Sequence, residues 1–221
     1  MKILILGASR GIGLEFVRQY RAAGATVIAT ARGAAGLQRI EALGAKPLKL
    51  DVTDPASISG LGWQLDDEKL DIALYVAGVY THGGAKEPPS RHEFDRAMHT
   101  NVLGAMQAIP QVAPFVEAAG GKFAFITSEM GRIGTVDSSY GWVYRASKAA
   151  LNMAVAAAQS DYPKATFIAL NPGWVKTDMG GADAELEVDA SVEWMRHTIA
   201  AAQHKRHVQF LDYNGQPFKS W

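Results

Sequence analysis

Residues 1 to 13 read MKILILGASRGIG, a short apolar run followed by a glycine-rich turn. The run from Ile3 to Leu6 predicts a buried β-strand, because it is brief and a glycine ends it. From residue 11 to residue 23 apolar residues recur at helical spacing, and Gly24 stops the pattern. This stretch therefore predicts a strand, a glycine loop and a helix in direct succession, as an α/β fold requires.

The turn holds Gly7, Gly11 and Gly13 in the spacing G-x-x-x-G-x-G. Glycines let the backbone turn tightly and approach a pyrophosphate, and the following helix points its N-terminal amides at the anion. A tight turn without a ligand is the alternative, and the flanking strand and helix make it the weaker one. We therefore expect a dinucleotide at this turn. Its expected contacts are Gly7, Ser9, Arg10, Gly11, Ile12 and Gly13.

The end of the second expected strand bears on which dinucleotide binds. An acidic residue about 20 positions after the glycines would bond the ribose hydroxyls of NAD, but here the strand ends Ala31-Arg32. Guanidinium groups suit phosphate oxygens, so Arg32 and Arg10 favour NADP(H), although each could be an ordinary surface residue. Asp51, at the end of the third expected strand, could cap the next segment or accept a bond from the adenine amino group.

Strand-length apolar runs alternate with helical patterns along nearly the whole chain. The expected strands are 3–6, 26–31, 47–52, 72–76, 122–127, 165–170 and 207–211. The expected helices are 11–23, 37–43, 56–65, 93–119, 144–160 and 190–202. Pro110 and Pro114 should kink or divide the longest of these helices. The alternation predicts a single α/β domain over residues 1–221, a Rossmann-type doubly wound parallel sheet with helices on both faces.

The composition gives no reason to expect nucleic acid or a membrane as a partner. Lys plus Arg and Asp plus Glu number 22 each, so the formal net charge is zero. No apolar stretch approaches the ~20 residues of a membrane span. The chain has no cysteine, which excludes disulfides and thiolate metal ligands, and its six histidines show no metal-ligand spacing. We expect a cytoplasmic protein without a metal.

A possible acid lies in the sequence YGWVYRASKA, residues 140–149. Tyr144 and Lys148 are four residues apart, so on a helix both side chains lie on one face. A nearby ammonium would lower the tyrosine pKa from its usual value of about 10 and prepare the phenol for proton transfer. The alternative is a Tyr/Lys pair on a solvated helix face, but the glycine loop independently indicates a hydride enzyme. Tyr140 has no such lysine partner and is a candidate for the pocket wall.

The motifs GASRGIG, YRASK and NPGWVKTDMG together resemble the short-chain dehydrogenase/reductase family over almost all residues. The resemblance implies that Tyr144 is the proton donor for carbonyl reduction, and that Lys148 binds the nicotinamide ribose and lowers the tyrosine pKa. It implies that Ser128, in FAFITSEMG, hydrogen-bonds the substrate carbonyl. It also implies that Asn101, in HTNVLGA, holds a water for proton relay, whereas a structural asparagine bonding nearby backbone is the alternative.

One feature of the catalytic motifs departs from the family pattern. Ser128 precedes Tyr144 by 16 residues, more than is usual, so extra residues should loop between them. Ser138 and Ser139 are competitors for the serine role, but neither directly follows a strand.

The resemblance also extends the cofactor site. The added contacts are Asp51, Val52, Ala77, Gly78, Tyr144, Lys148, Pro172, Gly173, Val175 and Thr177. Leu6 stands where the family often has threonine, and Tyr75 and Val76 stand where it usually has two asparagines. We expect the backbone approach to the cofactor to survive and the side-chain bonds that brace the central strands to be lost.

The sequences PGWVKTDMGG and FLDYNGQPFKSW look most like the branch with sniffer-type carbonyl reductases and bacterial C-signal factors. The resemblance implies an NADPH-dependent reductase of a ketone or aldehyde, with a small-molecule carbonyl substrate. The alternative is an NADP(H)-binding regulatory or signalling protein with little turnover. A homodimer or homotetramer formed through helices 93–119 and 144–160 is implied as well. Residues 178–192 should form a mobile lid, and apolar pocket walls are expected from Met130, Trp142, Trp174, Met179 and Trp194.

Overall fold

A seven-stranded parallel sheet runs through the computed structural model, which describes residues 1–65 and 68–221. The strands are β1 (Lys2–Leu6), β2 (Thr26–Ala31), β3 (Lys46–Lys49), β4 (Ile72–Tyr75), β5 (Lys122–Ile126), β6 (Thr166–Asn171) and β7 (Gln209–Asp212). Their order is β3-β2-β1-β4-β5-β6-β7, so the winding direction reverses between β1 and β4. The expected doubly wound Rossmann-type sheet is confirmed.

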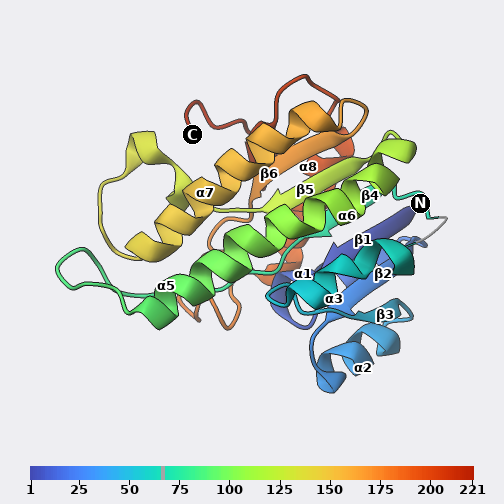
Figure 1. Ribbon diagram of the computed structural model, residues 1–221, viewed down its shortest axis with the longest axis horizontal. Helices are drawn as coiled ribbons and strands as arrows, with labels where there is room; N and C mark the ends of the chain where they lie inside the picture. The colour runs from blue at the N-terminus through green and yellow to red at the C-terminus, as the bar shows by residue number, and fades with distance from the viewer. Residues whose placement is uncertain (66–67) are drawn as a thin grey trace.

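Helices cover both faces of this sheet (Figure 1). They are α1 (Gly11–Ala22), α2 (Ala34–Ala42), α3 (Pro55–Ser59), α4 (Leu61–Gln64), α5 (Arg91–Met98), α6 (Gly104–Ala118), α7 (Trp142–Ala158) and α8 (Val188–Ala201). Helices α3, α4, α6 and α7 pack on one face, and α1, α2 and α8 pack on the other. Leu4 and Leu6 enter the first of these cores whereas Ile3 and Ile5 enter the second, as the period-two geometry of a strand requires.

The third strand is shorter than its sequence pattern predicts. We expect residues 47–52, but β3 ends at Lys49, and Asp51 lies in the turn beyond it. The strand is at the edge of the sheet, and β2 is its neighbour there. Since β2 itself ends at Ala31, no further ladder is available to the residues after Leu50, whose amide bonds the Ala31 carbonyl. The expected helix 56–65 is likewise two short helices, α3 and α4, which meet at Gly60.

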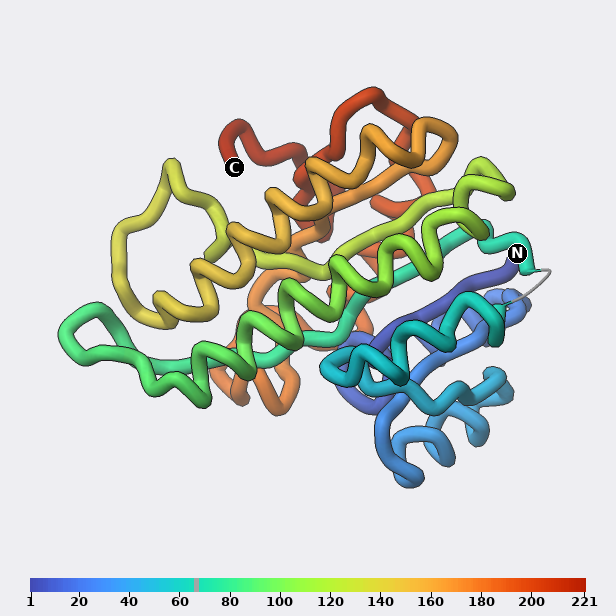
Figure 2. Tube along the Cα trace, viewed as in Figure 1, coloured from blue at the N-terminus to red at the C-terminus, as the bar shows by residue number. Residues whose placement is uncertain are grey.

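The expectation that proline divides the long helix is wrong. Helix α6 continues through Pro110 and Pro114, and the trace in Figure 2 runs on from α5 into α6. Both prolines lie on the exposed side, where water can reach the carbonyls that lose an amide partner. The regular helix is interrupted instead at His99–Leu103, which forms a π-helical turn.

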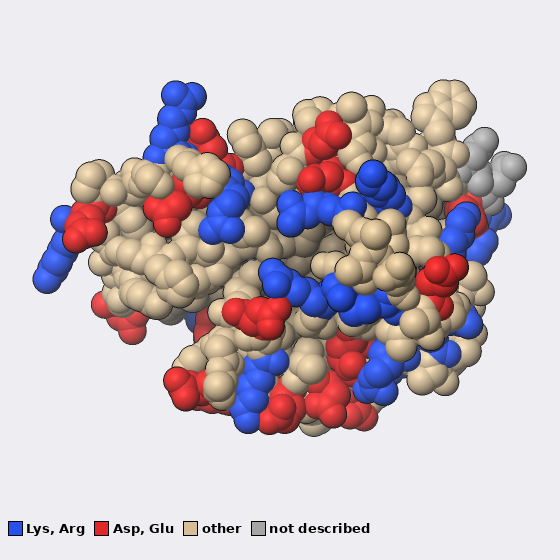
Figure 3. All heavy atoms as spheres, turned by 90° about the horizontal axis from the view of Figure 1, so that it is seen from below, with Lys and Arg blue, Asp and Glu red and all other residues tan. Residues whose placement is uncertain are grey.

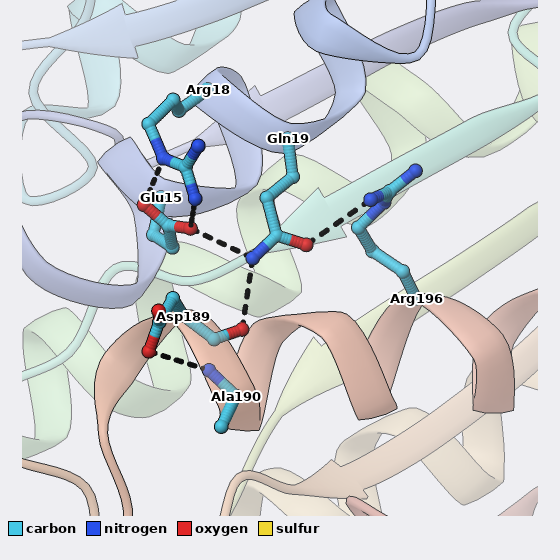
Figure 4. A network of polar contacts seen from close by, with 6 residues as sticks. All are labelled: Glu15, Arg18, Gln19, Asp189, Ala190 and Arg196. Carbon is cyan, nitrogen blue, oxygen red and sulfur yellow. Dashed lines mark hydrogen bonds and ion pairs between the residues drawn. The ribbon is translucent and has the colours of Figure 1, made fainter.

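A polar cluster fastens α1 to α8 on the second face (Figure 4). The Gln19 amide nitrogen donates to the Asp189 carbonyl at 2.9 Å, and its amide oxygen accepts from Arg196 at 3.1 Å. The same nitrogen donates to Glu15, which also pairs with Arg18. Gln19 is buried, so these bonds offset the cost of removing its amide from water. They hold the helix after the glycine turn beside the helix that follows residues 178–187.

No helix within the described residues combines the length and the apolar character needed to cross a bilayer.

Gly13 has no room for a side chain. A Cβ at this position would lie 2.2 Å from the Gly7 carbonyl oxygen, and backbone cannot move aside cheaply. We expect Gly13→Ala to lower the free energy of unfolding by about 1–3 kcal/mol, despite the helix propensity that alanine adds. Urea denaturation measures this loss. Gly60→Ala is the control, because its Cβ would meet Gln64 at 3.7 Å, an ordinary contact. Equal stability of the two variants would contradict the packing argument.

Candidate active site

A groove of about 1320 Å³ lies at the carboxyl ends of the strands, where the winding direction reverses between β1 and β4. Ligands of open α/β sheets bind at such a switch point. All expected cofactor contacts line this groove except Gly173 and Val175. In the view from below, Figure 3 shows Lys and Arg side chains gathered about a hollow near the middle of the face.

The glycine turn forms one wall of the groove through close backbone contacts. Gly7 has φ +92°, and a Cβ there would lie 2.6 Å from the Ala77 nitrogen. Gly11 has φ +52° and begins α1 opposite Thr177. The Gly7 amide donates to the hydroxyl of Thr30, a groove residue that sequence reasoning missed. The glycines therefore allow these close backbone contacts, and the turn at the N-terminus of α1 fits the pyrophosphate of a dinucleotide.

Three arginines face the end of the groove where β2 and the glycine turn meet. Arg10 pairs with Asp178 at 2.9 Å across the groove, and Arg32 lies 3.8 Å from Asp51. Arg39 donates to the Ser9 carbonyl at 2.9 Å. Sequence reasoning missed Arg39, because its partner is 30 residues away and it lies in no motif. These cations are arranged to receive a phosphate group.

Asp51 has a local structural task as well as a place in the groove. One carboxylate oxygen accepts from the Thr53 amide at 2.9 Å and from the Thr53 hydroxyl at 2.7 Å. The cap of α3 is Asp54, whose carboxylate accepts from the Ala56 amide. Asp51 therefore does not cap α3, which was one of its two expected roles. Its other carboxylate oxygen faces Arg32.

Tyr144 and Lys148 lie one turn apart on α7, in the buried end of the groove. Their exposed fractions are 8% and 4%, so neither belongs to a solvated helix face. The Lys148 ammonium is 5.5 Å from the centre of the Tyr144 ring and donates to the Ile126 carbonyl at 2.9 Å. Helix geometry and burial thus place an acid and a cation together at the inner end of the site.

Burial shifts the pKa values of Tyr144 and Lys148 in opposite directions. It raises the pKa of Tyr144 above its usual value, and the hydrogen bond with Ser128 offsets part of this rise. It lowers the pKa of Lys148 to about 8. The pKa of Tyr144 is therefore raised and not lowered, since desolvation of the phenolate is the largest effect on it, and the effect of the Lys148 charge stays a prediction. At neutral pH Tyr144 is a protonated phenol and can donate.

Ser128 is the serine that reaches the tyrosine. It begins the short 3₁₀ turn after β5, its hydroxyl accepts from the Met130 amide at 3.1 Å, and it offsets part of the rise in the pKa of Tyr144. Ser138 instead accepts from the amide of Tyr140, and Ser139 lies against Gly84. The extra residues between Ser128 and Tyr144 form an exposed loop, as the spacing predicts.

Asn101 is fully buried, and both polar atoms of its side chain are hydrogen-bonded within the protein. The amide oxygen accepts from the Val79 amide at 2.8 Å, and the amide nitrogen donates to the Val79 carbonyl at 2.9 Å. The nitrogen also donates to Ser147, whose hydroxyl donates to the Tyr144 carbonyl at 2.7 Å. The side chain joins the loop at Val79 to α7, and the role of Asn101 in a water relay stays a prediction.

The segment after β6 meets the groove only in part. Pro172 and Thr177 line it, whereas Val175 is buried and paired with Leu186 in an isolated bridge. Gly173 has φ +76°, and a Cβ there would lie 2.6 Å from Leu186, so its glycine has a packing reason.

The lid expected over residues 178–192 is shorter than its sequence suggests. Residues 188–192 belong to α8, and Lys176 pairs with Glu187 at 2.6 Å just before that helix. Met179 lines the groove as expected, while Trp194 lies exposed on α8 beside His197. Mobility of residues 178–187 stays a prediction.

Two loops, one around residues 80–83 and the other around residues 140–141, meet beside Tyr144 and form an aromatic wall. The Gly141 amide donates to the Gly83 carbonyl at 2.7 Å, and the His82 ring nitrogen lies 3.1 Å from the Tyr140 hydroxyl. The ring of Tyr80 lies 4.7 Å from that of Tyr144. Tyr140 is half exposed and is not among the residues that line the groove, so its place at the substrate pocket stays a prediction. Tyr80 was missed, because only the fold brings the two loops together.

Comparisons with known proteins agree with this site. The family model described as short chain dehydrogenase matches residues 1–187. C-signal of Myxococcus xanthus is 34% identical over 149 residues, 66% of this chain and 90% of that protein. The carbonyl reductase Sniffer of D. melanogaster has a TM-score of 0.90 at 26% identity, covering 100% of this chain and 99% of that one.

A Burkholderia multivorans short-chain dehydrogenase/reductase with bound NADP also has a TM-score of 0.90, at 29% identity, and covers 98% of this chain and 97% of that one. The match to the family model extends over far more than half of the residues. The chain therefore belongs to the short-chain dehydrogenase/reductase family, in the branch of Sniffer-type carbonyl reductases and C-signal, and binds a cofactor of the NAD(P) type.

Proposed function

We propose that this protein is an NADPH-dependent reductase that converts a ketone or aldehyde into an alcohol. The observation that carries the proposal is the buried, protonated Tyr144 beside Lys148 at the inner end of the groove. A phenol held in that state is a proton donor placed where a carbonyl oxygen would become an alkoxide.

The proposed reaction assigns one task to each polar side chain. The hydride that reduces the carbonyl carbon comes from NADPH when the cofactor is bound. Ser128 donates a hydrogen bond to the substrate oxygen and polarises the carbonyl, and Tyr144 gives its proton to the same oxygen. Lys148 holds the ribose and places a positive charge beside the phenolate that Tyr144 leaves behind. Asn101 keeps α7 and the Val79 loop in register with these groups.

The preference for NADPH over NADH is proposed from the arginines. Arg10, Arg32 and Arg39 all line the groove, and no carboxylate follows β2 to bond the ribose hydroxyls of NAD. A 2′-phosphate would meet guanidinium donors there. The relative from Burkholderia multivorans is described with bound NADP, which supports this choice.

A second candidate function is an NADP(H)-binding signalling protein with little turnover. The similarity to C-signal favours it, because that name denotes a signal rather than a reaction. The two functions differ in one measurable quantity, the rate of NADPH oxidation in the presence of carbonyl compounds. Rapid oxidation supports the reductase, whereas tight NADPH binding without turnover supports the signalling protein.

We also propose that the protein self-associates through the helices that carry Asn101 and Tyr144. Their outer faces expose apolar side chains, namely Phe94, Leu103, Met106 and Met153. Pairing would bury these side chains. The expected location in the cytoplasm stays a prediction.

Tyr144→Phe tests the proposed reaction most directly. The unchanged chain should oxidise NADPH with at least one member of a panel of ketones and aldehydes. We expect Tyr144→Phe to lower kcat/KM for that substrate about 10²- to 10⁴-fold, because the proton donor is gone while the ring remains. NADPH binding, followed by fluorescence titration, should change little. Tyr162→Phe, outside the groove, is the control. Full activity of Tyr144→Phe would refute the assignment.

Arg32→Ala tests the choice of dinucleotide. It removes one guanidinium from the end of the groove where the 2′-phosphate would lie, so we expect NADPH affinity to fall about tenfold. NADH affinity should stay within about twofold, since NADH has no phosphate at that position. Arg18→Ala, whose side chain pairs with Glu15 on α1, is the matched control. Equal losses of affinity for NADPH and NADH would show that Arg32 does not bind the 2′-phosphate.

The pH dependence of activity should report Lys148. Its pKa in the folded chain is lowered to about 8, so the ammonium is lost as the pH rises through that value. We expect kcat/KM for carbonyl reduction to fall above about pH 8. The unfolded chain binds more protons at this group between about pH 8 and 10.5, so its contribution to stability rises over that range. Circular dichroism should accordingly show a folded chain while activity declines, and activity that is flat to pH 10 would contradict the role of the ammonium.

A further inference from the structure

The π-helical turn at His99–Leu103 releases one backbone carbonyl from the helix. The Gly104 amide donates to the His99 carbonyl, five residues back. In a regular α-helix the same amide would donate to Thr100. The turn therefore leaves the Thr100 carbonyl without its helical partner, and Thr100 is buried. A buried carbonyl without a hydrogen bond is costly, so another donor is required.

Tyr75 supplies that donor from the last position of β4. Its hydroxyl donates to the Thr100 carbonyl at 2.7 Å, and the tyrosine is fully buried. The contact needs a glycine opposite, because a Cβ on Gly104 would lie 2.6 Å from the Tyr75 oxygen. The strand, the hydroxyl and the helix thus fit together at a single point of the core.

The released carbonyl is next to the residue that joins the parts of the site. Asn101 follows Thr100 directly and bonds both backbone atoms of Val79. It also bonds Ser147, which bonds the Tyr144 carbonyl. A shift of the π turn would break the bonds of the Asn101 side chain to Val79 and to Ser147 at the same time.

We propose that Tyr75 is a positioning residue of the active site: its hydroxyl fixes the π turn and thereby holds Asn101, the Val79 loop and α7 in one arrangement. The proposal rests on the proposed reductase function for its kinetic effect, and on geometry alone for its effect on the loop. Nothing in the burial of a tyrosine requires such a bond. Tyr20 is also buried, and its hydroxyl has no hydrogen-bond partner among the residues that the structure describes.

Tyr75→Phe tests the role, and Tyr20→Phe is the matched control. Both variants lose one buried hydroxyl and keep the ring. We expect hydrogen exchange of the Val79 amide to become about tenfold faster in Tyr75→Phe and to stay unchanged in Tyr20→Phe. The kcat for carbonyl reduction should fall about tenfold in Tyr75→Phe, with the KM for NADPH within about twofold. A structural defect alone would not separate kcat from KM in this way.

A double-mutant cycle with Asn101→Ala identifies the route of the effect. If Tyr75 acts through Asn101, adding Tyr75→Phe to Asn101→Ala should change neither Val79 exchange nor kcat further. Multiplying losses would overturn the proposal. The exchange measurement needs no substrate, so a protein without turnover would refute the reductase function and leave this test intact.

The unchanged chain offers a measurement that does not depend on any variant. A hydroxyl proton held in a buried bond exchanges slowly, so NMR should detect that of Tyr75 with a through-space contact to the Thr100–Asn101 backbone. A rapidly exchanging Tyr75 hydroxyl would overturn the proposal, as would Val79 exchange that is the same in Tyr75→Phe and the unchanged chain.

Discussion

Direct contact between two backbones, at the carboxyl ends of β1 and β4, holds the functional half of this molecule together. The Leu6 carbonyl accepts from both the Val76 and the Ala77 amides, at 2.9 and 3.0 Å. Gly7 leaves room for this approach, because any Cβ would overlap the Ala77 backbone. The glycine turn and the loop that leads to Val79 are therefore fixed relative to each other before any side chain contributes. One loop is the proposed cradle of a phosphate, and the other meets α7.

The other end of the groove depends on buried polar groups that satisfy one another. Lys148, Asn101 and Ser147 are all almost fully buried, and each has hydrogen-bond partners in the protein. Unpaired, such groups would cost more than the fold could offset. Paired, they define a single arrangement. Desolvation raises the pKa of Tyr144, so its phenol stays protonated, and lowers the pKa of Lys148 to about 8. The burial that fixes the site therefore also sets the protonation states of its two titratable groups.

Local patterns revealed most of the fold and the principal site residues, and non-local contacts account for what they missed. The strands and the glycine turn follow from short-range periodicity, and the Tyr144–Lys148 pair follows from one helical turn. The sequence could not foresee that desolvation would raise the pKa of Tyr144, because spacing carries no information about burial. Arg39 and Tyr80 were missed for a related reason: their partners lie 30 or more residues away and only the folded chain unites them. The prediction of a helix break at Pro110 and Pro114 was wrong, because both lie on the exposed side of α6. Water can there bond the carbonyls that lose an amide partner.

Tyr75 stands where the family pattern has asparagine, and it braces the centre of the molecule through a different hydrogen bond. The family pattern predicts a short amide there that braces neighbouring strands, and its absence suggests a weaker centre. The longer tyrosine instead extends beyond the sheet to the Thr100 carbonyl, where a π turn has left an acceptor without a donor. Such a bond can form only if the facing helix residue has no side chain, and Gly104 meets that condition. The hydrogen bond of Tyr75 therefore lies at the junction between sheet and helix and not between strands. It couples strand β4 to the turn that carries Asn101.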